Sequence, residues 1–362
     1  MLPNKIVRMK SVLLLLVAIV CFNPINIFAE VPRIKVGAIL ILTGANSEYG
    51  VQARRGAQVA IDEINNLGGV NQKQFEFIWE DETSGKAERT VAAYKKLTVV
   101  DKVDYIFGPS FQDGLLAIAP MARKDNILLL TPSTPSLSLP NVFSTWIDPH
   151  IEADIVAEHM LKKFKKISVL AAQQSWELMV ADAFKKKVIE LGGVISSYAD
   201  PLNTSTDLKP EVLRVRESQP DAVFISSYTL FPYYVKELRR QGVSVPIFTI
   251  EADNAGIQAG GVEAEGVVSI GPSIPETDFT KKYLVKFGVL PDIPSYQAYD
   301  AVKMLAEAIK ANGEGTENAL KFFKLFKQFD GASGVMTNVN GIVSTSTAFF
   351  VVQNGKLERL DS

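Results

Sequence analysis

The sequence predicts an α/β fold of two doubly wound, Rossmann-like lobes, each a parallel sheet with helices on both faces. Strand and helix patterns alternate along almost the whole chain, which is typical of parallel βαβ units. The alternation comes in two series of similar layout, and a helix of each series ends in Leu-Gly-Gly-Val, at 67–70 and 191–194. About 330 residues beyond the N-terminal segment are enough to form two hydrophobic cores.

Residues 34–70 form the clearest β-loop-α unit. The run 34–42 is almost entirely apolar, as expected of a parallel strand that is buried on both faces. A small polar loop at 43–47 leads into a helix whose packed face consists of Ala53, Gly56, Ala57, Ala60, Ile61 and Ile64. The pair Gly68-Gly69 ends this helix, because glycine enters left-handed geometry at little cost. Open α/β sheets bind small ligands at such strand-end loops.

The remaining elements follow in chain order. In the first series we expect strands at 75–79, 105–107, 127–130 and 142–147, and helices at 86–100 and 114–123. In the second series we expect helices at 151–165, 177–191, 208–217 and 233–240, and strands at 167–171, 194–198, 222–226 and 246–250. The last part has predicted helices at 278–287, 295–310 and 317–329, and strands at 341–352 and 357–360.

Residues 1–29 are predicted to be a cleaved signal peptide. Three basic residues precede an apolar stretch at 11–22, which is short for a membrane span, and Ala29 ends a plausible cleavage site. A lipoprotein anchored at Cys21 is an alternative, which the bulky Val20 before it disfavours. We therefore expect a periplasmic or other extracytoplasmic location.

Composition excludes several function classes. Removal of the signal peptide leaves 35 basic and 40 acidic residues, a charge that disfavours nucleic acid as a partner. Cys21 is the only cysteine, so the mature chain would have no disulfide and no cysteine nucleophile. The GxSxG, P-loop and HExxH motifs are absent, and the spacing of His150 and His159 says nothing about a metal. We predict no catalytic residue, metal ligand or cofactor, and expect a binding protein, not an enzyme.

The first unit also resembles a known family. The run TG-x4-YG-x3-RRGAQVAIDEIN-x-LGGV is similar to the first motif of the leucine/isoleucine/valine-binding proteins. These are solute receptors of ABC importers with the type I periplasmic binding protein fold. The resemblance implies two lobes joined by three crossing segments, which we place near Asp148, Ser273 and Ser333. The N-terminal lobe would then be 30–148 plus 274–332, and the C-terminal lobe 149–273 plus 333–362.

Two loops of the first lobe are candidates for ligand contact. At 108–112 a Gly-Pro turn precedes a helix, whose free N–H groups can bind a carboxylate. In the resembled family a serine there takes the ligand carboxylate; here that position is Gln112, and Ser110 could substitute. At 131–135 the family's threonine position is Pro135, which has neither hydroxyl nor N–H. Ser133 and Thr134 are the candidate contacts there.

Aromatic side chains supply further candidates. Trp176 falls where the family places an aromatic residue before a second-lobe helix, although such a residue can also pack within its own lobe. Tyr49, in the family's aromatic-Gly position, is the expected apolar wall of the first lobe. One or two members of a second-lobe aromatic group should face the cleft, and we select Tyr228 and Phe231 over Tyr233 and Tyr234.

Glu251 is the candidate charged contact. It ends a predicted strand, and the resembled family's glutamate at this place pairs with the ligand ammonium. A carboxylate left unpaired in a closed cleft is costly, so its presence suggests a cationic or strongly donating ligand group. Asp253 fits better as a helix N-cap.

These features predict an extracytoplasmic solute-binding protein of an ABC importer. Its small-molecule ligand would be an amino acid or a related amide or acid, captured between the lobes by hinge closure. A membrane permease and its ATPase would then recognise the closed form. A ligand sensor of the same fold that signals to a partner protein is the alternative. Because Gln112 and Pro135 depart from the family pattern, an aromatic or non-α-amino ligand stays open.

Overall fold

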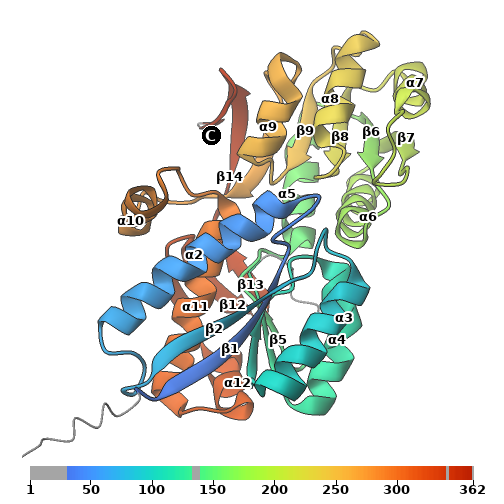
Figure 1. Cartoon of the computed structure of the whole chain (residues 1–362). Coiled ribbons are helices and arrows are strands. Elements are labelled where there is room, and N and C mark those ends of the chain that lie inside the picture. Colours follow the sequence, from blue (N-terminus) through green and yellow to red (C-terminus); the bar gives the residue numbers. More distant parts are fainter. Residues whose placement is uncertain (1–30, 133–138, 340–341, 361–362) are drawn as a thin grey trace, which may run out of the picture. The chain divides into compact units, whose positions relative to one another are not determined.

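Two largely parallel sheets organise the chain (Figure 1). The computed structural model describes residues 31–132, 139–339 and 342–360. The first sheet has the strand order β2-β1-β3-β4-β5, and the second has the order β15-β14-β10-β9-β8-β6-β7. The parallel strands β7-β6-β8-β9-β10 thus repeat the order of the first sheet, whereas β14 and β15 are antiparallel additions. Both lobes have the 2-1-3-4-5 order, which places ligands at the carboxyl ends of the strands.

In the first lobe, strands and helices alternate as the sequence predicts. The strands are β1 (Arg33–Leu40), β2 (Gln74–Asp81), β3 (Tyr105–Phe107), β4 (Leu128–Thr131) and β5 (Val142–Ser144). The helices between them are α2 (Ser47–Asn66), α3 (Ala87–Lys95), which continues into a π-helical turn at Lys96–Asp101, and α4 (Gln112–Asp125). Side chains of β1 alternate between two cores: Val36 and Leu40 pack with α2, whereas Ile39 packs with α3 and α4. The sheet is therefore covered on both faces.

Helix α2 packs closely on α11 (Ile293–Asn312), which returns from the far end of the chain (Figure 1). Gly56 is at the contact, where an added Cβ would lie 2.0 Å from the backbone oxygen of Ser295. Glycine is required here because the two backbones leave no room for a side chain.

The second lobe has the same organisation. Its elements in order are α5 (Pro149–Leu161), β6 (Lys166–Ala171), α6 (Ser175–Glu190), β7 (Val194–Ala199), α7 (Lys209–Ser218), β8 (Ala222–Ser226), α8 (Phe231–Arg240), β9 (Ile247–Ile250), α9 (Asn254–Gly260), a 3-10 turn at Gly261–Ala264, and β10 (Val268–Pro272). One core lies between the sheet and α5 and α6, and the other between the sheet and α7 and α8. The sequence did not predict α9 or β10.

The third crossing, expected near Ser333, is misplaced. After α10 (Asp278–Phe287), α11 and α12 (Thr316–Leu325), a small sheet forms from β11 (Gln328–Gly331), β12 (Gly334–Val339) and β13 (Ile342–Thr345). Met336 and Val343 of this sheet are buried in the first-lobe core, so the chain is still in the first lobe there. It leaves with β14 (Thr347–Gln353), which pairs with β10 and is followed by β15 (Lys356–Arg359). The boundaries near Asp148 and Ser273 stay proposals.

Ser346 lies beside the boundary proposed near Ser273, because the Ser273 N–H donates to the Ser346 carbonyl oxygen at 2.7 Å. The predicted helix 317–329 ends early because Gln328–Gly331 pairs with β12, and the predicted strand 341–352 is divided between β13 and β14. Among the described helices, none combines the length and apolar character needed to cross a membrane. The predicted signal peptide 1–29 and Cys21 lie outside the described residues.

Candidate ligand-binding site

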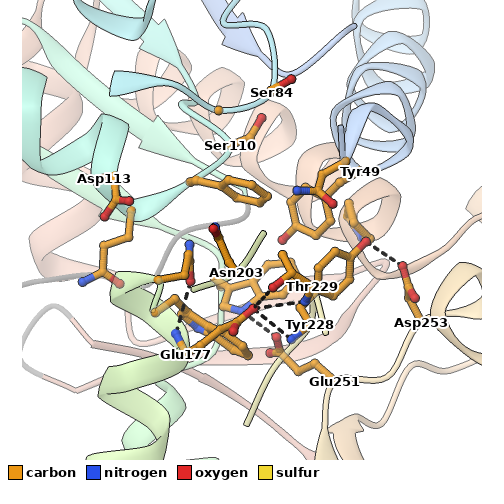
Figure 2. Close-up of a pocket in the computed structure, with 18 of the residues that line it drawn as sticks. Tyr49, Ser84, Ser110, Asp113, Glu177, Asn203, Tyr228, Thr229, Glu251 and Asp253 are labelled. Atoms are coloured by element: carbon orange, nitrogen blue, oxygen red, sulfur yellow. Dashed lines mark hydrogen bonds between the residues drawn. The ribbon is translucent and has the colours of Figure 1, made fainter. Parts of the chain in front are cut away.

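A cavity of about 130 Å³ lies where strand-end loops of both lobes meet (Figure 2). The first lobe lines it with the loops after β1, β2 and β3 and the start of α11, and the second with the loops after β6, β7, β8 and β9. These loops follow the carboxyl ends of parallel strands, as predicted from the sequence. An apolar cavity of about 150 Å³ holds a benzene molecule, so this cavity suits a ligand about the size of one ring.

Most of the predicted site residues lie around this cavity. Those that line it are Tyr49, Ser110, Gln112, Trp176, Tyr228 and Glu251. The choice of Phe231 is wrong: this first residue of α8 is 4% exposed and packs in the second-lobe core. Of its neighbours, Tyr234 is buried with its hydroxyl on the Ala171 carbonyl, and Tyr233 is exposed. Ser133 and Thr134 lie outside the described residues. Ligand contact by the lining residues stays a prediction.

Aromatic rings meet around Tyr49. Its ring centroid lies 5.9 Å from those of Phe111, Trp146 and Tyr228, all of which line the cavity. Tyr49 and Phe111 belong to the first lobe, Tyr228 to the second, and Trp146 to the segment before α5. The cavity is therefore walled by rings from both lobes.

The loop after β3 is bound by an acid of the protein itself. The Ser110 N–H donates to Oε1 of Glu82 at 2.7 Å, and Oε2 of Glu82 accepts from the Thr90 hydroxyl at 2.7 Å. The Ser110 Oγ accepts from the Ile41 N–H at 3.0 Å. Glu82 is fully buried, and this burial raises its pKa. These bonds fix the loop at the switch point between β1 and β3.

Glu177 plays a similar part in the second lobe. Its Oε1 accepts from the N–H groups of Tyr228 and Thr229, both at 3.1 Å, and from the Thr229 hydroxyl at 2.9 Å. Burial raises the pKa of this carboxyl, and the surrounding donors oppose the shift. Glu177 therefore holds the loop after β8 against the start of α6 (Figure 2).

Glu251 has a less complete set of donors. Its Oε2 accepts from the Trp146 indole N–H at 3.0 Å, whereas Oε1 is buried and accepts from no N–H or hydroxyl of the described residues. The fully buried carboxyl of Glu152 faces Glu251. Burial raises the pKa of both groups, and mutual repulsion raises that of Glu152 further, so the pair shares a proton. Glu251 also has a φ of 49°, a strained value that is common at functional sites.

The lobes also contact each other at the rim of the cavity. The Ser175 hydroxyl on α6 donates to Asp113 on α4. On α9, the backbone and side-chain N–H groups of Asn254 donate to Asp292, the N-cap of α11, at 3.2 and 3.1 Å. These polar contacts are small and exposed, so hinge motion can break them at low cost.

The chain matches known proteins over nearly its whole length. A family model described as periplasmic binding protein covers residues 33–356. The chain belongs to the periplasmic binding protein family. The Leu/Ile/Val-binding protein BraC3 of Rhizobium johnstonii is 25% identical over an alignment of 370 positions, which covers 96% of this chain and 98% of that protein. The predicted resemblance to leucine/isoleucine/valine-binding proteins is thereby confirmed.

Solved structures agree on the fold. The leucine binding protein LivK of Thermotoga maritima has a TM-score of 0.84 at 23% identity, covering 91% of this chain and 98% of that one. A solute binding protein of an ABC transporter from Rhodopseudomonas palustris, in complex with 3,4-dihydroxy benzoic acid, has a TM-score of 0.82 at 20% identity, covering 90% and 95%. The type I periplasmic binding protein fold predicted from the sequence is confirmed.

Several lining residues of this periplasmic binding protein could not be predicted from the sequence. Trp146 was assigned to a strand, and only its place just before the first crossing pointed to the cleft. Glu177 was treated as part of the Trp176 loop, and Asp253 as an N-cap, which it is: Oδ1 accepts from the Gly256 N–H at 2.6 Å. Within the described part of the chain, no three His, Cys, Asp or Glu side chains gather as a metal site would require.

Proposed function

We propose that this protein is the extracytoplasmic solute-binding component of an ABC importer. It binds an amino acid or a related small polar molecule in the cavity, and closure about the three crossing segments buries the ligand. The observation that carries the proposal is the cavity lined by strand-end loops of both lobes. A ligand there contacts both lobes and therefore favours the closed form, which a membrane permease and its ATPase would recognise.

The size and lining of the cavity support a small ligand with an apolar body. Relatives are named for leucine, isoleucine and valine, and a solved relative contains a dihydroxybenzoic acid. The rings around Tyr49 offer such a body a contact surface, and Glu251 offers a partner for an amino group.

Isothermal calorimetry against a panel of amino acids, amides, amines and aromatic and aliphatic acids tests this function. Ligand-free protein should bind at least one compound with 1:1 stoichiometry. Small-angle X-ray scattering of the same sample should show a smaller radius of gyration with ligand than without it. A silent panel, or binding with an unchanged radius, would contradict the proposal.

The proposed function requires that the protein is exported from the cytoplasm. We place the mature protein outside the cytoplasm because residues 1–29 have the pattern of a signal peptide. N-terminal sequencing of the exported protein should give Glu30 as the first residue. A mature protein that begins at Cys21 would support the lipoprotein alternative instead.

A further inference from the structure

The charges around the cavity oppose a ligand that carries a carboxylate. The ionisable side chains that line it, tyrosines aside, are Asp113, Glu177, Glu251 and Asp253. No Lys, Arg or His is found among the described lining residues. The segment 133–138, Ser-Thr-Pro-Ser-Leu-Ser, has no basic residue in the sequence either. A ligand anion would therefore meet acids without a compensating cation.

The backbone N–H group that could bind a ligand anion in the first lobe already donates to an acid of the protein. The Ser110 N–H precedes α4 and would suit a carboxylate, but it donates to the buried Glu82. The adjacent lining side chain is Gln112, which carries no charge. The first lobe thus satisfies this donor internally and leaves it unavailable to a ligand carboxylate.

Among the lining acids, Glu251 is the one to which a donor group of the ligand would bind. Asp253 accepts from the Tyr228 hydroxyl at 2.8 Å, and Asp113 accepts from Ser175. Glu177 accepts from three groups on Oε1, although its buried Oε2, like Oε1 of Glu251, accepts from no donor of the described residues. Unlike Glu177, Glu251 has a second buried carboxyl facing it. The buried Oε1 of Glu251 accepts from no N–H group of the described residues, and the carboxyl that faces Glu251 is that of Glu152. A pair of buried carboxyls that shares one proton still carries a negative charge, which is costly without a positive partner, and a protonated ligand N–H group would remove that cost.

The aromatic walls also favour a positive charge. The faces of aromatic rings attract cations, most strongly when water is excluded. Tyr49, Phe111, Trp146 and Tyr228 lie around the same cavity as Glu251, and the Trp146 indole is bonded to its carboxylate. A cation at Glu251 would therefore lie beside aromatic rings.

We propose that the ligand is a small protonated primary or secondary amine without a carboxylate, with its N–H groups on Glu251 and its apolar body against Tyr49. This proposal rests on the function proposed above and narrows its ligand class. An α-amino acid would bring its carboxylate among the four acids and onto an amide that Glu82 already occupies. A quaternary ammonium has no N–H for Oε1 of Glu251.

Calorimetry with matched compounds tests the proposal. One set is 3-methylbutylamine, leucine and 4-methylpentanoic acid; the other is 2-phenylethylamine, phenylalanine and 3-phenylpropanoic acid. Each set keeps one apolar body and varies the charged groups. We expect one of the amines to bind at least tenfold more tightly than its amino acid, the matching acid to show no binding, and the N,N,N-trimethyl derivative of that amine to bind at least tenfold more weakly.

Tighter binding of an amino acid or acid than of its amine would overturn the amine proposal and leave the solute-binding function standing. If no compound binds, the result would count against both the amine proposal and the solute-binding function. Glu251→Gln should weaken amine binding more than tenfold, whereas Glu358→Gln, on the exposed strand β15, should not change it. If Glu251→Gln does not fold, Tyr49→Leu takes its place and should weaken amine binding severalfold; unchanged affinity in the folded variant would overturn the proposal.

Discussion

Replacing Glu152 with glutamine should change how the stability of the ligand-free protein depends on pH. Glu152 and Glu251 are 0% and 8% exposed and face each other, with the Asp148 carboxyl nearby adding to the repulsion at Glu152. Two carboxylates in this position cannot both ionise cheaply, so the folded protein retains a proton that the unfolded chain releases. The raised pKa of the pair therefore lowers the free energy of unfolding as pH rises.

The magnitude follows from linkage. Where the folded state holds one proton more than the unfolded chain, the free energy of unfolding falls by about 1.4 kcal/mol per pH unit. The fall begins above the pKa of an unfolded-state glutamate, about 4.3, and continues until the folded pair ionises. Between pH 5 and pH 7 the pair should therefore lower the free energy of unfolding by ~2.7 kcal/mol.

In Glu152→Gln, the amide N–H can donate to Glu251, and the shared proton is no longer needed. Urea unfolding at pH 5, 6 and 7 should give a slope against pH that is shallower than wild type by up to about 1.4 kcal/mol per unit, because burial still raises the Glu251 pKa in the variant. Other buried acids, such as Glu177 and Asp253, contribute equally to both proteins and cancel in the difference. Glu358→Gln is the matched control and should keep the wild-type slope. Equal slopes for Glu152→Gln and wild type would refute the shared-proton account.

Three further predictions concern the cleft and the turn between β11 and β12. Trp176→Ala should weaken ligand binding by about 1 kcal/mol while ligand-free unfolding stays cooperative; loss of cooperativity would assign the ring to the core. Asp300→Asn should destabilise the protein at pH 7 by about 1–3 kcal/mol, because the carboxylate accepts from two backbone N–H groups after β11, and no destabilisation in urea would contradict this. Burial raises the Asp300 pKa to about 6, so the free energy of unfolding of the wild type should fall as the pH rises from about 4 to 6. The variant has no carboxyl at this position and should not show this fall. Ser175→Ala removes the hydroxyl on Asp113 and should lower affinity by about 0.5–1.5 kcal/mol and enlarge the ligand-free radius of gyration; an unchanged radius would show that the bond does not hold the lobes.

The sequence predicted the lobes because their signals are local. A buried parallel strand such as 34–42 is apolar throughout, and its helix carries a packed face that Gly56 brings onto α11. Strand-end loops then follow from topology, so Tyr49, Ser110 and Glu251 could be expected at one cleft. These inferences need only the periodicity of apolar residues along the chain and the rule that open α/β sheets bind ligands at the switch point of the strand order.

What the sequence did not predict depends on long-range contacts. The crossing at Ser346 was missed because nothing local shows that Met336 packs in the first-lobe core. Phe231 and Tyr228 are equally aromatic, and only the burial of Phe231 in the second-lobe core separates it from Tyr228, which lines the cavity. The Glu152–Glu251 pair joins residues about a hundred positions apart, and no spacing rule connects them.

Tryptophan emission offers the most direct test of a ligand site between the lobes. Two of the three tryptophans, Trp146 and Trp176, line the cavity, whereas Trp79 lies on β2 under the Arg54 guanidinium. Titrating the Trp79→Phe protein with the tightest compound from the matched sets should give a saturable emission change, and Glu251→Gln in the same background should lose it at the same concentrations. Saturable binding by calorimetry without any emission change, or an unaltered titration in the Glu251→Gln protein, would place the ligand elsewhere and contradict the account.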